Sequence, residues 1–112
     1  MNVLCLFCSE AVKNSSSVEL SGLLKRLDEK DAFVTEICVD DIKSEAGGNV
    51  ICYTFSVILR MMCNNDVLYI IHEEERSVFD NLMFSVLTGL GIDVREISVS
   101  ADAGAKDRES HE

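Results

Sequence analysis

The sequence predicts a small α/β fold: a doubly wound (Rossmann-like) three-layer sandwich with a largely parallel sheet of about four strands, in the order β-α-β-α-β-α-β. Apolar runs of strand length, typical of strands covered on both faces, alternate with amphipathic helical segments. The chain has 112 residues, 47% of them hydrophobic, which suffices for one core but not for two. We therefore expect a single domain over residues 1–100 and a disordered acidic tail over residues 101–112.

The first half of the chain contains two predicted strands and one clear helix. Four leucines between residues 20 and 27 repeat at i, i+3, i+4 and i+7, and Ser16 precedes Glu19 at the spacing of a capping box. Asp40 and Asp41 end a run rich in β-branched and aromatic residues. The predicted elements are a strand over 2–8, a helix over 17–30, a strand over 32–39 and a loop over 43–49.

The segment Val50–Cys63 fits either a helix or a strand. Its β-branched and aromatic start favours a strand that pairs with residues 32–39 in a hairpin, whereas Leu59–Met62, followed by two asparagines, favours a helix end. The next strand, residues 67–72, needs a crossover if it is parallel to its neighbour, and a helix is the usual crossover. We therefore predict a helix.

The last quarter of the domain has the clearest helix signal. Ser77 lies three residues before Asp80, apolar residues then mark one helical face, and Gly91 stands where a left-handed residue would end the helix. Residues 92–99 alternate apolar and charged side chains, as in an edge strand with one wetter face.

Charge and cysteine usage restrict the location and the partners. A net charge of −10 repels phosphate backbones, so we expect no nonspecific nucleic-acid binding. The apolar start, Met1–Cys8, lacks the basic region and cleavage site of a signal peptide, and no apolar stretch has the length of a membrane span, so we expect no membrane association and a cytoplasmic location. The five cysteines are an odd number within apolar runs, which predicts reduced thiols that bind no zinc.

Doubly wound folds bind ligands beyond the carboxyl ends of their strands. This strand-end rule selects residues 8–10, 40–41, 72–75 and 98–100, which include six carboxylates. Glu10, Asp40, Asp41 and Glu74 are the candidate metal ligands, because such clusters hold Mg²⁺ together with a phosphate substrate. In that interpretation Glu10, His72 and Glu74 are the candidate catalytic residues, with His72 as acid or base. The competing interpretation is that acidic residues simply belong at solvated strand ends.

This layout resembles the Toprim domains of primases, topoisomerases and small nucleases. Those domains place a Glu after their first strand and Asp-x-Asp after a later one; Glu10 matches the former, and His72-x-Glu74 stands in place of the latter. The resemblance implies metal-dependent phosphoryl transfer, but His72 removes one metal-binding carboxylate and no glycine precedes Glu10. A second likeness, to nucleoside deoxyribosyltransferase and TIR-type domains, lacks the catalytic Glu, since the matching helix offers only Asp80.

Cys8 is a further candidate, because a thiolate at a strand end before a serine-rich helix start gains from the helix dipole. The glycines and the arginine of phosphate-handling cysteine loops are missing around it.

Two functional hypotheses follow. The first is a noncatalytic binding or regulatory module that uses no cofactor and forms a homodimer, or binds a protein partner, through Val50–Met62, which has one charge in thirteen residues. The second is a Mg²⁺-dependent phosphoryl-transfer or phosphodiester enzyme, for which a small nucleotide is a better substrate than a polyanion because of the acidic surface.

Overall fold

A computed structural model describes residues 1–99 and has the predicted α/β architecture, with a four-stranded, entirely parallel sheet. The expected tail over 101–112 lies outside the described residues. The strands are β1 (Asn2–Phe7), β2 (Phe33–Cys38), β3 (Val67–Glu73) and β4 (Val94–Val99). The helices are α1 (Glu10–Lys13), α2 (Val18–Glu29), α3 (Val39–Glu45), α4 (Val50–Met62) and α5 (Val78–Gly89).

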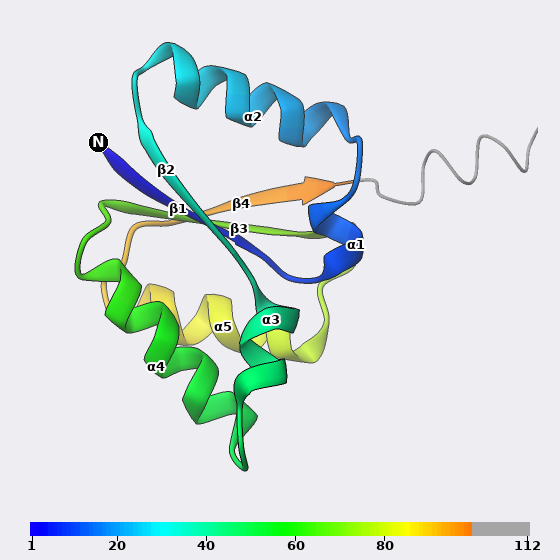
Figure 1. Ribbon diagram of the computed structural model, residues 1–112, viewed down its shortest axis with the longest axis vertical. Helices are drawn as coiled ribbons and strands as arrows, with labels where there is room; N and C mark the ends of the chain where they lie inside the picture. The colour runs from blue at the N-terminus through cyan, green and yellow to red at the C-terminus, as the bar shows by residue number, and fades with distance from the viewer. Residues whose placement is uncertain (100–112) are drawn as a thin grey trace, which may run out of the picture.

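The strand order β2-β1-β3-β4 makes the fold doubly wound. From β1 the chain passes to β2 on one side; it then returns past β1 to β3 and continues to β4 on the other side. Helix α2 covers one face of the sheet, and α3, α4 and α5 cover the other (Figure 1). The winding direction therefore reverses between β1 and β3, the two central strands.

Each face of the sheet has its own apolar core. On the α2 face, Val3, Cys5 and Phe7 of β1 pack with Leu23 and Leu27. On the other face, the alternate residues of β1 pack with residues of α3, α4 and α5, namely Leu4, Leu6, Ile42, Ile58, Met83 and Leu87. The continuous apolar runs of β1 and β3 follow from this arrangement, because both faces of these central strands are covered.

The segment Val50–Met62 is a helix, α4, as predicted, and the hairpin alternative is wrong because β2 pairs in parallel with β1. The Asn49 side chain caps it by accepting a hydrogen bond from the amide of Cys52 at 2.9 Å. Thr54 and Ile58 are its buried residues. Because β3 is parallel to its neighbour, the chain needs a crossover before it, and a helix is the usual crossover. This requirement chose correctly between the helix pattern and the strand pattern of the segment.

Two helices lie where the sequence analysis expected none. Asp40 and Asp41, expected to end the second strand, form the first turn of α3. Helix α3 extends into the expected loop over 43–49 because Val39 and Ile42 bury apolar surface. Helix α1 follows β1 directly, capped by the hydroxyl of Ser9. Both helices have fewer than eight residues, which is too short for a periodic signal.

The ends of α2 and α5 are close to expectation. Ser17, and not Ser16, caps α2 by accepting from the amide of Leu20, so the predicted capping box with Glu19 is wrong. The box at the start of α5 is confirmed: Ser77 and Asp80 bond each other's backbone amides reciprocally. Gly91, with φ of 83°, ends this helix as predicted.

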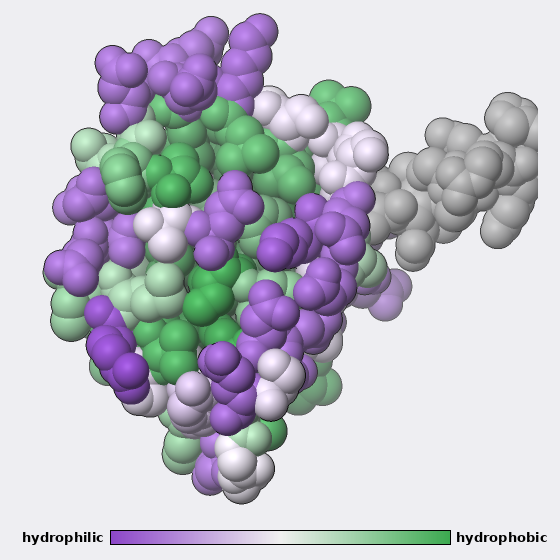
Figure 2. Space-filling view, in the orientation of Figure 1, coloured by the Kyte–Doolittle hydropathy of each residue, from purple (hydrophilic) through white to green (hydrophobic). Residues whose placement is uncertain are grey.

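The surface is uneven in character. In Figure 2 polar and charged side chains cover the outside of α2, and apolar side chains reach the surface between α2 and α4, where β2 forms the edge of the sheet. Within residues 1–99, no helix combines the length and the apolar character that a membrane crossing requires.

Candidate functional site

A cavity of about 430 Å³ lies at the carboxyl ends of β1 and β3, where the winding direction of the fold reverses. Doubly wound folds bind their ligands at this position, because the loops from the two strands diverge there to opposite faces of the sheet. The lining residues come from the ends of β1 and β3 and from the three helices nearby: Cys8, Ser9, Val12, Lys43, Glu73, Glu75, Arg76, Ser77, Phe79 and Asp80.

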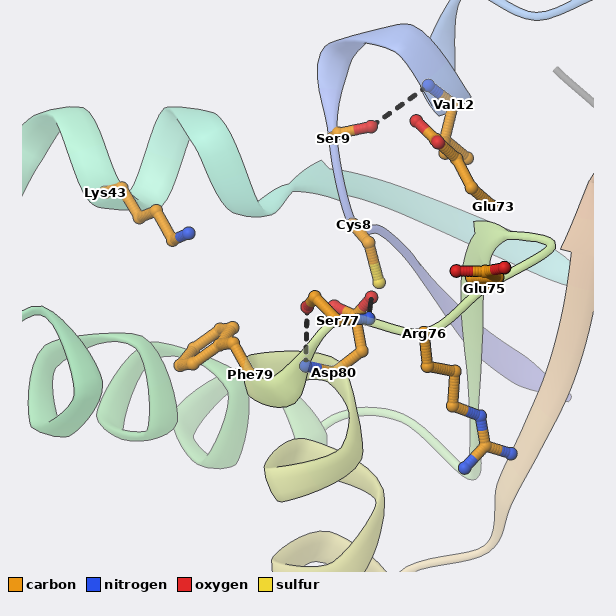
Figure 3. A pocket seen from close by; sticks show the side chains of 10 residues that line it. All are labelled: Cys8, Ser9, Val12, Lys43, Glu73, Glu75, Arg76, Ser77, Phe79 and Asp80. Atoms are coloured by element: carbon orange, nitrogen blue, oxygen red, sulfur yellow. Dashed lines mark hydrogen bonds between the residues drawn. The ribbon is translucent and has the colours of Figure 1, made fainter. Parts of the chain in front are cut away.

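Cys8 and Asp80 face each other across the cavity floor (Figure 3). Burial raises the pKa of the Cys8 thiol far above its usual range, and the charge of Asp80 and a side-chain hydrogen bond to it raise the pKa further. Asp80 is held in place because it caps α5 together with Ser77. Cys8 is therefore a protonated thiol, which argues against the thiolate nucleophile considered from the sequence.

Lys43 supplies a cation from the α3 side of the cavity. Its ammonium group lies 5.0 Å from the centroid of the Phe79 ring, and it makes no ion pair within residues 1–99. On the opposite side, Glu73 and Glu75 add negative charge. The cavity thus combines one cation, an aromatic ring, two serine hydroxyls and three carboxylates, which is a lining for a polar molecule that is not a polyanion.

The guanidinium of Arg76 points away from the cavity towards β4 (Figure 3). Its Nε donates to Oε2 of Glu96 at 2.8 Å, its Nη2 forms an ion pair with the same oxygen at 2.6 Å, and the guanidinium stacks 3.9 Å from the centroid of the Phe84 ring. His72 donates to the same carboxylate. Partial burial would raise the pKa of Glu96, but the hydrogen bonds and charges of Arg76 and His72 outweigh it and lower that pKa.

His72, a predicted catalytic residue, is 2% exposed and does not line the cavity. Its Nε2 lies 2.5 Å from the Glu96 carboxylate, its Nδ1 bonds the backbone carbonyl of Glu73, and its ring meets Phe84 edge-on. Both nitrogens are thus engaged within the fold, and nothing exposes them to a substrate. The geometry therefore supports a structural role for His72 and not the predicted role as acid or base.

The predicted metal ligands are only partly brought together. Glu10 and Asp41 join Cys38 in a group whose ligand atoms lie within 4.8 Å of one another. Asp40 instead accepts a hydrogen bond from the backbone amide of Glu10 at 2.9 Å. Glu74 lies in the exposed loop after β3 and is not a member of the group. Neither Glu10 nor Glu74 lines the cavity.

The donor atoms of this group fit Mg²⁺ poorly. Cys38 is fully buried, and burial raises the pKa of its thiol. A protonated sulfur is a weak ligand, and Mg²⁺ prefers six oxygen ligands in octahedral geometry. Two exposed carboxylates remain, a common surface arrangement.

Cys5 and Cys8 lie on opposite faces of the sheet, so their spacing forms no metal or disulfide pair. Cys5 belongs to the core beneath α2, and Cys8 packs against the core on the other face. Burial raises the pKa of Cys5 to about 11, with a smaller contribution from Glu36. All five cysteines are free thiols in the structure.

Sequence reasoning found part of the cavity and missed the rest. The strand-end rule named Cys8, Ser9, Glu73 and Glu75, all of which line it. Arg76 and Ser77 directly follow the named carboxylates, so extending the rule along the loop would have found them. Lys43 was assigned to a loop, and only the fold of α3 brings it to the cavity.

The fold and the cavity define a small, doubly wound α/β protein with a polar cavity at its switch point. No family model, no curated protein and no solved structure matches the chain significantly.

Proposed function

We propose that this protein is a noncatalytic binding or regulatory module that holds a small polar molecule in the switch-point cavity and associates with itself through α4. The observation that carries the proposal is the cavity of about 430 Å³ between the ends of β1 and β3. Ligand sites in proteins commonly have about 300–1,000 Å³ and occur at this position of open α/β sheets.

The state of the candidate catalytic groups supports a noncatalytic role. Cys8 is a protonated thiol hydrogen-bonded to Asp80, and His72 uses both ring nitrogens inside the fold. A cysteine nucleophile reacts as the thiolate, and an acid–base catalyst needs contact with its substrate. Neither group meets these conditions.

A ligand-observed and protein-observed NMR screen tests the binding proposal. The probes are amino acids, nucleosides and mononucleotides, since the cavity offers Lys43 for an anionic group and carboxylates for an amine. We expect at least one class to shift the amide signals of Ser9, Ser77 and Phe79, and Phe79→Ala to weaken that effect. Shifts confined to residues outside the cavity, or none at all, would refute the proposal.

Matched lysine variants separate specific binding from a general charge effect. Lys43→Gln removes the cation of the cavity, and Lys30→Gln removes a cation at the end of α2, which is not part of the cavity lining. For a ligand with an acidic group, only Lys43→Gln should raise the dissociation constant, by about tenfold, the loss expected for one charge-assisted hydrogen bond.

Self-association is supported by the low charge of α4 and α5. The thirteen residues of α4 contain Arg60 as their single charge, and the twelve of α5 contain only Asp80, which is buried. In a chain with 27% charged residues and a net charge of −10, the α4 and α5 surface is the face on which a second copy meets the least repulsion. Sedimentation equilibrium at micromolar concentration tests it, and a monomer throughout would refute it.

The Mg²⁺-dependent enzyme remains the alternative function, favoured only by the proximity of Glu10 and Asp41. Calorimetric titration with MgCl₂ distinguishes it. We expect no saturable binding below millimolar concentration, whereas binding that Asp41→Asn abolishes would favour the enzyme.

A cytoplasmic location belongs to the same proposal. Its support is the set of five free thiols, which suits a reducing compartment.

A further inference from the structure

The switch-point cavity contains a buried charge that the fold itself does not pair. Asp80 is 8% exposed, and its Oδ2 accepts a hydrogen bond from the backbone amide of Ser77 at 3.0 Å. The Cys8 thiol also bonds to this carboxylate. Both donors are neutral, and Asp80 makes no ion pair within residues 1–99. The start of α5 supplies only about half an elementary charge. Because buried charges in proteins are normally paired, a cation beside Asp80 is missing.

Lys43 presents the opposite charge to the same cavity. Its ammonium group lies 5.0 Å from the centroid of the Phe79 ring and pairs with no carboxylate in the described part of the chain, Asp80 included. In Figure 3 Lys43 extends from α3 towards the cavity, and Asp80 lies below Cys8 on the floor. Two opposite charges that share a cavity without meeting leave room for a molecule that carries both an ammonium and a carboxylate group.

Glu73 and Glu75 add further negative charge on the side of the cavity opposite Lys43 (Figure 3). Neither forms an ion pair among residues 1–99, and Arg76 does not offset them because its guanidinium is paired with Glu96. Three carboxylates against one ammonium group leave an excess of two negative charges in the lining. A ligand with an additional cation reduces this excess, whereas a mononucleotide or an acidic amino acid increases it.

The carboxylates of the cavity are spread out and do not converge on one point. Within the described residues, the group whose ligand atoms lie within 4.8 Å of one another consists of Glu10, Cys38 and Asp41, and none of these lines the cavity. A metal ion needs its ligands around one centre. Separated carboxylates instead suit separated cationic groups of one organic molecule.

We propose that the ligand of the cavity is a free basic amino acid such as lysine. Its α-ammonium group pairs with Asp80, and its α-carboxylate pairs with Lys43. Its side-chain cation pairs with Glu73 and Glu75. This inference rests on the binding function proposed above and names the class of ligand. A neutral amino acid would leave the two glutamates unpaired, and a diamine would leave Lys43 without an anion.

Ligands that each lack one charged group test the assignment without altering the protein. Norleucine lacks the side-chain ammonium of lysine, ε-aminocaproate lacks the α-ammonium, and cadaverine lacks the carboxylate. In NMR titrations we expect lysine to shift the amide signals of Ser9, Ser77 and Phe79. Each analogue should bind at least tenfold more weakly, because each loses one charge-assisted contact. An analogue that binds as tightly as lysine would overturn the proposal.

Matched variants assign each charged group of the ligand to its partner. Asp80→Asn keeps the size of the side chain and an oxygen that can accept from the amide of Ser77. It should weaken lysine binding about tenfold and leave ε-aminocaproate binding unchanged, because that analogue has no group for Asp80. Equal losses for both ligands would contradict the assignment, since a merely structural effect would weaken both. Glu19→Gln, in the exposed first turn of α2 and outside the cavity lining, is the control and should change neither affinity.

The exposed glutamates provide a second test that does not depend on the folding of Asp80→Asn. The double variant Glu73→Gln and Glu75→Gln should weaken lysine binding at least tenfold and leave norleucine binding unchanged. Circular dichroism verifies that each variant folds. Equal losses for lysine and norleucine would contradict the proposed contact.

Other outcomes separate the ligand class from the binding function itself. If a nucleoside shifts the cavity amides of Ser9, Ser77 and Phe79 while lysine and arginine do not, the ligand class is wrong and the binding function stands. If no probe shifts these signals, both proposals fail.

Discussion

His72 on β3 and Glu96 on β4 lie on the same face of the sheet, with the Nε2 and Oε2 atoms 2.5 Å apart. Arg76 donates to the same carboxylate, and both Arg76 and His72 contact the ring of Phe84. Glu96 thus ties the edge strand β4 to the loop that borders the cavity.

Replacement of Glu96 should destabilise the fold. Glu96→Gln removes the charge that pairs with His72 and Arg76, and because the carboxylate is 40% exposed we expect a loss of only about 1–2 kcal/mol at pH 7. Urea denaturation measures it. Glu36→Gln, at an exposed position of the edge strand β2, serves as the control and should change stability by less than about 0.5 kcal/mol. Equal effects would contradict the network.

The same carboxylate predicts a dependence on acid pH. Because the pKa of Glu96 is lower in the folded than in the unfolded chain, its contribution is present above the unfolded value of about 4.3 and is lost as the pH falls through the folded value. The stability difference between wild type and Glu96→Gln should therefore shrink as the pH falls below about 4.3. A difference that grows with acidity would refute the assignment.

Thr54 predicts a stabilising substitution. Its side chain is fully buried on α4, and its hydroxyl has no hydrogen-bond partner within residues 1–99. Thr54→Val keeps the shape and removes the unpaired hydroxyl, so we expect a gain of about 1 kcal/mol in the free energy of unfolding. Thr88→Val, at an exposed position of α5, is the control. Equal or lower stability for Thr54→Val would show that water satisfies the hydroxyl.

Two neighbours on α4 should respond differently to truncation. Ile58 is fully buried against the sheet, whereas Leu59 is 38% exposed on the outer side of α4. Ile58→Ala should cost about 2–5 kcal/mol, because it leaves a cavity in the core, and Leu59→Ala should cost less than about 1 kcal/mol. Both are measured by urea denaturation at a concentration where the protein is monomeric. Similar costs would mean that α4 is rotated from the orientation described here.

Local patterns in the sequence were sufficient for most elements. The apolar runs of β1 and β3 and the apolar repeat of α2 and α5 each contain enough residues to show a period, and Ser77 with Gly91 gave both ends of α5. The α4 segment shows the limit of such patterns, because a helix that buries Thr54 and Ile58 yet exposes Ile51 and Leu59 has apolar residues on all sides.

The candidate site was less accessible to sequence reasoning. The strand-end rule selected Cys8 and Glu75 correctly because it depends only on strand direction. It also selected His72, whose side chain turns into the fold to meet Glu96, since a rule about backbone position says nothing about the direction of a side chain. Glu10 and Glu74 follow strands as well, yet the strand order and the turn of α1 direct them elsewhere.

The sequence by itself determined the class of fold, the position of the strands and the low charge of α4, because these depend on composition and on periods of two to four residues. Only the tertiary structure decided that β1 and β3 are neighbours, that Lys43 reaches the cavity, and that burial beside Asp80 keeps Cys8 protonated. These relationships join residues more than thirty positions apart, and their energies depend on burial and distance, which no local pattern encodes.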